Sequence, residues 1–241
     1  MKQNRKGLSI LKKMLSVLLA CGLVPTLFLP GMTVSAAGGT YVSGPITSGG
    51  EYVIPRTSIE ITINTSEPVT LSPEVQSAVY AYNHVTINCV ASGVDLTLNG
   101  IRISLLEDKN IISFTGSGNK LRMLGTDNLL ANNQDMSEPE PPLGGTLRAQ
   151  KSLIHVPSGV ELYIYGPGKL SLKSKPDNMT TGKDASSIGG DAYEKGGSFH
   201  VMGGELYCMD GVDGINDEGG IIGGGFSACC RKIDILGGRV Y

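Results

Sequence analysis

A gapless repeat occupies the C-terminal quarter of the sequence. Residues 185–207 (ASSIGGDAYEKGGSFHVMGGELY) align at an offset of 34 residues with residues 219–241 (GGIIGGGFSACCRKIDILGGRVY). Apolar positions match in the two copies, while the residues between them differ. The identical pairs are Ile188 and Ile222, Gly189 and Gly223, Gly190 and Gly224, Gly203 and Gly237, Gly204 and Gly238, and Tyr207 and Tyr241. Stacked repeats produce this pattern, because inward side chains must pack against the next copy and outward ones are free to vary.

Alternating apolar residues predict short strands within and before the repeat. Each copy shows period-two alternation, a Gly-Gly bend and alternation again, which indicates strand, bend and strand. The same alternation predicts strands over 59–63, 85–89, 94–103 and 160–165, with a turn at Asn99-Gly100. No amphipathic helical pattern follows residue 36. We therefore expect an all-β fold, a right-handed single-stranded parallel β-helix, with a β-sandwich as the alternative.

The N-terminal segment differs from the rest in composition. Residues 1–36 carry five basic residues and no acidic one, ahead of an apolar run that ends in the small residues Val34-Ser35-Ala36. This pattern predicts a cleaved signal peptide over 1–36 and a secreted, extracellular domain over 37–241. No later stretch has the roughly 18 consecutive apolar residues of a membrane span. Cleavage removes five of the 20 lysines and arginines and none of the 22 acidic residues, leaving a net charge of −7, which argues against a nucleic-acid partner.

The cysteines do not indicate a disulfide framework. Four remain after residue 36, and two of them, Cys229 and Cys230, are adjacent. Cys89 and Cys208 lie within apolar strand patterns, where we expect small buried side chains.

Tyrosines and polar residues on one outward face form the candidate ligand site. Tyr163 and Tyr165 alternate with apolar residues, so both should point outward from one strand. Aligning the apolar positions of the predicted strands places Tyr163, His200 and Asp234 in one outward column. Such a column of aromatic and polar groups could hold a linear polysaccharide. The alternative is that outward tyrosines merely favour strands.

An acidic turn is the candidate metal site. Asp210, Asp213 and Asp217 lie in the segment MDGVDGINDEGG, where glycine bends expose backbone carbonyls. Oxygen ligands of this kind suit Ca²⁺, although the spacing matches neither an EF-hand loop nor the nonapeptide calcium repeat. Calcium could also bridge this net-negative protein to an acidic polymer such as a pectin-type uronate. The alternative is a turn of solvated acids.

Several segments together resemble a known family. The runs LTLNGIRIS (96–104), GVELYIYGPGKLSLKS (159–174) and MDGVDGI (209–215) resemble secreted carbohydrate-binding β-helix proteins of clostridia and related Firmicutes. The SIGG and IIGGG stretches are similar to repeats of large glycine-rich surface proteins of those bacteria. The resemblance implies a β-helix that binds plant or cell-wall polysaccharide without catalysis, with an acidic, calcium-assisted ligand as one form. The repeat match runs to Tyr241, so we expect an uncapped end, end-to-end stacking or a longer parent chain.

Two other functions stay open. A structural adhesin or surface stalk would use the repeats to supply length. A pectate-lyase-like enzyme would use the same architecture, but it needs clustered carboxylates and a positioned basic residue. Arg102, Lys120, Arg122 and Lys169 lie on or near predicted strands, with no carboxylate cluster evident at a matching position. We therefore expect no enzymatic activity.

Overall fold

The structure is a computed structural model, and the described residues form an all-β unit without helices. It describes residues 39–56, 59–75, 81–105, 107–125, 127–132, 151–173, 185–208 and 222–241. The chain divides into two units, Met1–Thr33 and Val34–Tyr241, and all described residues belong to the second. None of them belongs to a helix with the length and apolar character needed to cross a membrane. The predicted signal peptide lies outside the described residues.

The strands form two sheets. The strands of the eleven-stranded sheet are β1 (Thr40–Tyr41), β2 (Gly50–Ile54), β4 (Pro68–Pro73), β6 (Asp95–Asn99), β7 (Arg102–Leu105), β9 (Asn119–Leu124), β10 (Asn128–Asn132), β12 (Glu161–Tyr165), β13 (Lys169–Lys173), β15 (Gly196–Cys208) and β17 (Cys230–Val240). The strands of the six-stranded sheet are β3 (Ile59–Ile63), β5 (Val85–Cys89), β8 (Ile112–Phe114), β11 (Ile154–His155), β14 (Ile188–Gly189) and β16 (Ile222–Gly223).

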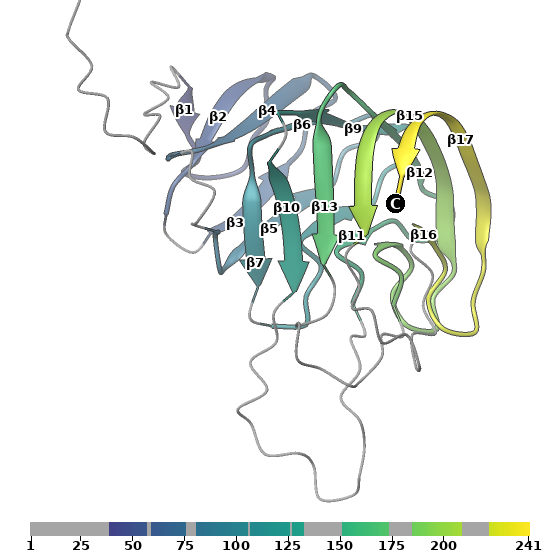
Figure 1. The fold of residues 1–241 in the computed structure, drawn as a ribbon. Coiled ribbons are helices and arrows are strands. Elements are labelled where there is room, and N and C mark those ends of the chain that lie inside the picture. The colour runs from purple at the N-terminus through teal and green to yellow at the C-terminus, as the bar shows by residue number, and fades with distance from the viewer. Residues whose placement is uncertain are drawn as a thin grey trace, which may run out of the picture. The chain divides into compact units, whose positions relative to one another are not determined.

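Every pairing between these strands is parallel, and strands that are distant in sequence lie side by side (Figure 1). The eleven-stranded sheet consists of two rows that the long β15 joins. The first half of β15 pairs with β12, and the second half of β15 pairs with β13. We call the row that contains β6, β9 and β12 row A, the row that contains β7, β10 and β13 row B, and the six-stranded sheet row C. From β5 onward the chain runs through rows C, A and B in turn. We call each such set of strands, for example β5, β6 and β7, a pass, and each pass lies beside the previous one.

The register of the repeat is as predicted except at Met202, which pairs with Gly237 instead of Leu236 because the ladder is irregular there. Ile188 of β14 pairs with Ile222 of β16, which are the identical residues of the two copies. Further along the copies, Phe199 pairs with Ile233 and Val201 with Ile235. The predicted strands over 59–63 and 85–89 coincide with β3 and β5, and the predicted turn at Asn99-Gly100 separates β6 from β7. Parallel stacking of the repeats and the absence of helices among the described residues are thus confirmed.

Inward side chains of the three rows form one core. In β12, Leu162 and Ile164 are fully buried while the residues on either side of them are half-buried, as expected for period-two alternation. Two buried asparagines are satisfied by backbone groups: the Asn119 side chain accepts from the Val94 amide at 3.0 Å, and Asn128 accepts from the Ile101 amide at 3.0 Å. These hydrogen bonds join neighbouring parts of the chain, and neither buried side-chain amide is left unsatisfied.

Glycine allows the close bend between rows A and B. Gly166 follows β12 and has φ of +114°, which a residue with a Cβ rarely adopts. A Cβ there would also lie 2.3 Å from the carbonyl oxygen of Met123 in the preceding pass of row A. The bend therefore requires glycine both for its backbone angle and for its distance from the neighbouring pass.

The cysteines among the described residues have different surroundings. Cys89 is fully buried in the core, as predicted, and burial raises the pKa of its thiol. Cys208 is half-buried at the edge of the core, so its predicted burial is only partial, and Cys229 is exposed.

These environments predict the order of thiol modification. We expect Cys229 to react with iodoacetamide in the native protein, and Cys89 to react only after unfolding, because the reactive thiolate is suppressed and inaccessible there. Peptide mapping by mass spectrometry, before and after denaturation in urea, measures both. Native-state labelling of Cys89 as fast as that of Cys229 would contradict the described core.

Candidate functional site

A column of polar and aromatic side chains runs across the outward face of row A. Strand register places Asp95, Lys120, Tyr163, His200 and Asp234 opposite one another on β6, β9, β12, β15 and β17. The predicted alignment of Tyr163, His200 and Asp234 is therefore present in the structure. Asp95 and Lys120 extend it by two strands that the sequence did not assign to the site. We call these five residues the row A column.

His200 connects three passes of the chain. Its ring stacks on the Tyr163 ring, with centroids 4.6 Å apart and an interplanar angle of 14°. Its Nε2 lies 3.1 Å from Glu161 Oε1, and its Nδ1 lies 2.9 Å from Asp234 Oδ2. An imidazolium satisfies both contacts, because only the charged ring donates from both nitrogens. His200 is 8% exposed, so it supports the column more than it contacts solvent.

Asp234 is held as a carboxylate by its neighbours. Lys232 Nζ lies 2.7 Å from Asp234 Oδ2 on the same strand. This contact, with a smaller effect from His200, lowers the pKa of Asp234 and raises the pKa of Lys232. The end of the row A column therefore presents a charged pair, and not an isolated acid.

Tyr165 lies beside the row A column on the same face of β12. Its hydroxyl donates to Asp95 Oδ1 at 2.9 Å, across two strands. Burial, with the contact to Asp95, raises the pKa of Tyr165 to about 12, so its hydroxyl stays a neutral donor at physiological pH. Tyr163, Tyr165 and Lys120 line an open hollow of about 530 Å³ together with Met202 and two glycines. The hollow offers ring surface, a cation and hydroxyl groups to one ligand.

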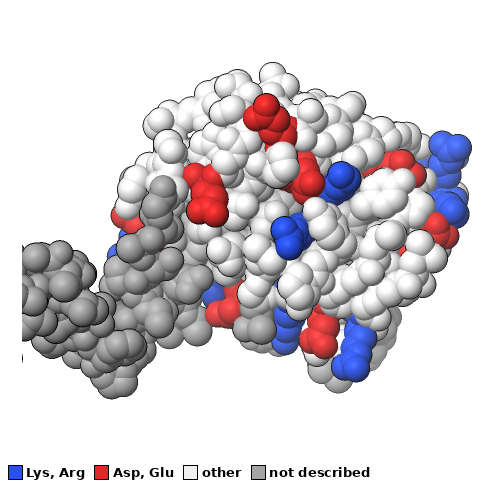
Figure 2. Space-filling model, turned by 90° about the horizontal axis from the view of Figure 1, so that it is seen from above, with Lys and Arg blue, Asp and Glu red and all other residues white. Residues whose placement is uncertain are grey.

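One face of the molecule shows dispersed charges. On the face seen from above, acidic and basic side chains of the described residues are interspersed among uncharged ones (Figure 2). Lys120 lies 3.8 Å from Asp95, and Arg102 pairs with Asp127. Each of these basic residues thus has one acidic neighbour, which neutralises the surface locally.

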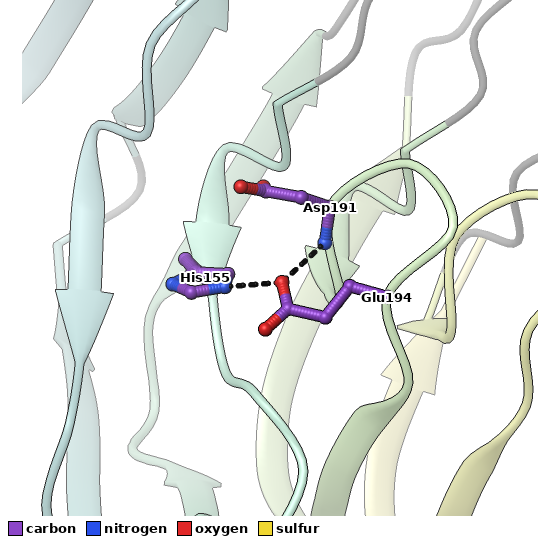
Figure 3. A group of neighbouring side chains, drawn as sticks. All are labelled: His155, Asp191 and Glu194. Carbon is purple, nitrogen blue, oxygen red and sulfur yellow. Dashed lines mark hydrogen bonds and ion pairs between the residues drawn. The ribbon is translucent and has the colours of Figure 1, made fainter.

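The predicted calcium ligands cannot be placed. Asp210, Asp213 and Asp217 all lie outside the described residues. Within the part of the chain that is described, one group of potential metal ligands is close enough to be considered: His155, Asp191 and Glu194, whose ligand atoms lie within 4.8 Å of one another (Figure 3).

Hydrogen bonds already engage all three members of this group. Glu194 Oε2 lies 2.7 Å from His155 Nε2 and accepts from the Asp191 amide at 3.2 Å. No dashed line joins the Asp191 carboxylate to His155 or Glu194 in Figure 3, and this carboxylate lies 2.7 Å from Lys151 Nζ. A metal ion would have to separate His155 from Glu194 and draw Asp191 away from Lys151. The three residues fit a cross-pass hydrogen-bond network better than a preformed metal centre.

Asp191 is the centre of this network. Its Oδ1 accepts from Asn110 Nδ2 at 2.8 Å, from the Ser152 amide at 2.9 Å and from Ser152 Oγ at 3.1 Å. These donors belong to the two preceding passes of the chain. Burial alone would raise the pKa of Asp191, but the bonds from Lys151, Ser152 and Asn110 outweigh it, and the pKa is lowered. An ionised carboxylate thus ties three passes together beside row C.

The class of this protein follows from its own fold and surface. No family model, curated protein or solved structure matches the chain. The described residues define an all-β protein of stacked parallel strands, with an aromatic and charged column across one outward face.

Proposed function

We propose that this chain is a secreted, right-handed single-stranded parallel β-helix that binds plant or cell-wall polysaccharide at the cell surface without catalysis. The repeated order of rows C, A and B supports the β-helix, because from β5 onward each pass extends every row. Right-handed connection is the general rule for parallel crossovers. The predicted signal peptide supports export.

The row A column carries the proposed binding function. Its side chains repeat at the spacing of parallel strands, about 4.8 Å, so they offer regularly spaced contacts along one direction. Sugar rings present C–H surfaces to aromatic groups and hydroxyls to polar ones. Tyr163 and Tyr165 supply the first kind of contact, and Lys120 with Asp95 supplies the second. A linear polysaccharide meets both along its length, whereas a compact ligand would use only part of the column.

Affinity electrophoresis tests this function. The purified domain should be retarded in gels in which a polysaccharide is immobilised, and it should migrate normally in gels without polysaccharide. Repeating the gel with EDTA tests calcium assistance, which would appear as lost retardation. An ultraviolet assay for unsaturated uronate products, run in parallel, tests the lyase alternative. Normal migration with cellulose-, xylan- and pectin-type polymers would contradict the proposal.

Tyr163→Ala should weaken binding about tenfold, the equivalent of about 1.4 kcal/mol, because it removes ring surface from the hollow. The fold should persist, since Tyr163 is half-buried on the outward face and its ring packs mainly on His200. Retardation at several polymer concentrations gives the affinity, and circular dichroism verifies the fold. Tyr41→Ala is the matched control, because Tyr41 is an exposed tyrosine at the far edge of the same sheet. Equal retardation of both variants would remove Tyr163 from the site.

A further inference from the structure

A second groove lies on the outward face of row C. It has a volume of about 580 Å³, within the range of ligand sites, and shares no lining residue with the hollow at Tyr163. Its floor consists of outward side chains from three successive strands: Glu60 on β3, Thr86 and Asn88 on β5, and Ser113 on β8. The groove therefore crosses the strands, as the row A column does.

The wall of this groove is held by the network around Asp191. Asn110 and Lys151 line the groove, and both are bonded to the Asp191 carboxylate, at 2.8 and 2.7 Å. Asp108, another lining residue, accepts from the Lys151 amide at 3.2 Å and from Asn132 Nδ2 at 3.3 Å. These bonds fix the wall before any ligand arrives, which lowers the entropy cost of binding.

The lining combines acidic, basic, amide and hydroxyl side chains with a few apolar ones. An anion would meet Glu60, Glu107 and Asp108, and a cation would meet Lys109 and Lys151. Two aliphatic side chains, Ile59 and Leu105, and the ring of His84 also line the groove, so a ligand meets apolar as well as polar surface. Hydroxyl groups both donate and accept hydrogen bonds, and so suit a lining that alternates acids, amides and amines.

Two asparagine side chains of the lining, Asn88 and Asn110, are oriented by hydrogen bonds from their amide nitrogens. Asn88 Nδ2 donates to Glu60 Oε1 at 2.6 Å, and Asn110 Nδ2 donates to the Ser152 carbonyl at 2.8 Å as well as to Asp191. With both amide nitrogens engaged by described residues, each side chain can offer its amide oxygen as an acceptor to a ligand hydroxyl.

We propose that this groove binds an uncharged, hydroxyl-rich polysaccharide segment, so that one molecule holds two polysaccharide chains, one on row A and one on row C. The inference rests on the proposed polysaccharide binding by the row A column. It extends that function from attachment to cross-linking, because two chains held by one rigid domain are joined.

Thr86→Trp tests the groove, because its bulky side chain fills the floor between Glu60 and Asn88. Titration calorimetry with cellohexaose, xylohexaose and mannohexaose as uncharged probes, and with hexagalacturonate as an acidic probe, measures each site. We expect Thr86→Trp to weaken the binding of at least one uncharged probe about tenfold or more. Thr70→Trp, at an outward threonine of β4 that lines neither hollow, is the matched control and should bind like the wild type.

Cross-linking supplies the second readout. Wild-type protein should raise the light scattering of dissolved polysaccharide, while Thr86→Trp and Tyr163→Ala should each bind polymer without raising it. If no uncharged probe binds, or if Thr86→Trp binds every probe as well as Thr70→Trp does, the second site is wrong and the row A proposal is unaffected. If Tyr163→Ala changes nothing while Thr86→Trp removes all binding, the groove stands and the row A site is wrong.

Discussion

Gly189→Ala is expected to lower the free energy of unfolding by about 4 kcal/mol or more, enough to leave much of the protein unfolded. Gly189 has φ of +140°, and a Cβ built on it lies 1.9 Å from the carbonyl oxygen of Gly223, its strand partner in the next pass. The clashing oxygen belongs to the backbone, which cannot move aside as a flexible side chain can, and Ser186 Oγ lies 2.7 Å from the same Cβ position. Urea denaturation followed by circular dichroism measures the loss.

Two other glycines separate the causes of this effect. Gly118 has φ of +72° with nothing within 4 Å of its added Cβ, so Gly118→Ala tests backbone strain alone and should cost about 1 kcal/mol. Gly44 shows neither strain nor contact, and Gly44→Ala should leave stability unchanged. If Gly189→Ala costs no more than Gly118→Ala, the passes do not approach one another as described.

Asp191→Ala is expected to lower the free energy of unfolding by about 3 kcal/mol. The substitution removes an acceptor of Asn110, Lys151 and Ser152. Ser152 is fully buried, so its amide loses this acceptor away from water, while its hydroxyl keeps the Gly189 carbonyl at 3.2 Å. Chemical denaturation measures the change. Asp127→Ala is the control, because Asp127 also pairs with a basic residue but is exposed, and exposed pairs contribute about 0–1 kcal/mol.

The same carboxylate should make stability depend on pH. The pKa of Asp191 is lower in the folded protein than in the unfolded chain. Its contribution is therefore complete above the unfolded value, about 3.9, and is lost as the pH falls through the folded value. Asp191→Asn should narrow the difference in stability between pH 6 and pH 3, because an amide does not titrate there. An equal acid-induced loss in the wild type and in Asp191→Asn would assign the acid sensitivity to other groups.

The sequence predicted the features that depend on local pattern. Period-two alternation located β3, β5 and β12, and the 34-residue repeat established the register of Ile188 with Ile222. The same alignment brought Tyr163, His200 and Asp234 together, because it needs only the apolar positions of neighbouring strands.

Contacts between irregular passes were not predictable. Residues 133–150 separate β10 from β11 and interrupt the spacing, so the sequence does not reveal that Lys120 lies opposite Tyr163. Asn110 and Asp191 are 81 residues apart, and no repeat relates them. The apolar alternation also does not distinguish a buried partner from an exposed one. Val201 is fully buried, whereas its partner Ile235 is 57% exposed on β17.

Disulfide trapping tests the superposition of successive passes, on which both proposed sites depend. In a variant with Cys229 and Cys230 replaced by serine, Ser198→Cys and Lys232→Cys place thiols on directly paired residues of β15 and β17. Paired strands lie about 4.8 Å apart, within the Cα range of a disulfide, about 4.4–6.8 Å. Mild oxidation should join these two cysteines, while Ser198→Cys with Asp234→Cys, two residues out of register, should stay reduced. Peptide maps that show the reverse preference, or no bond in either variant, would contradict the stacked arrangement.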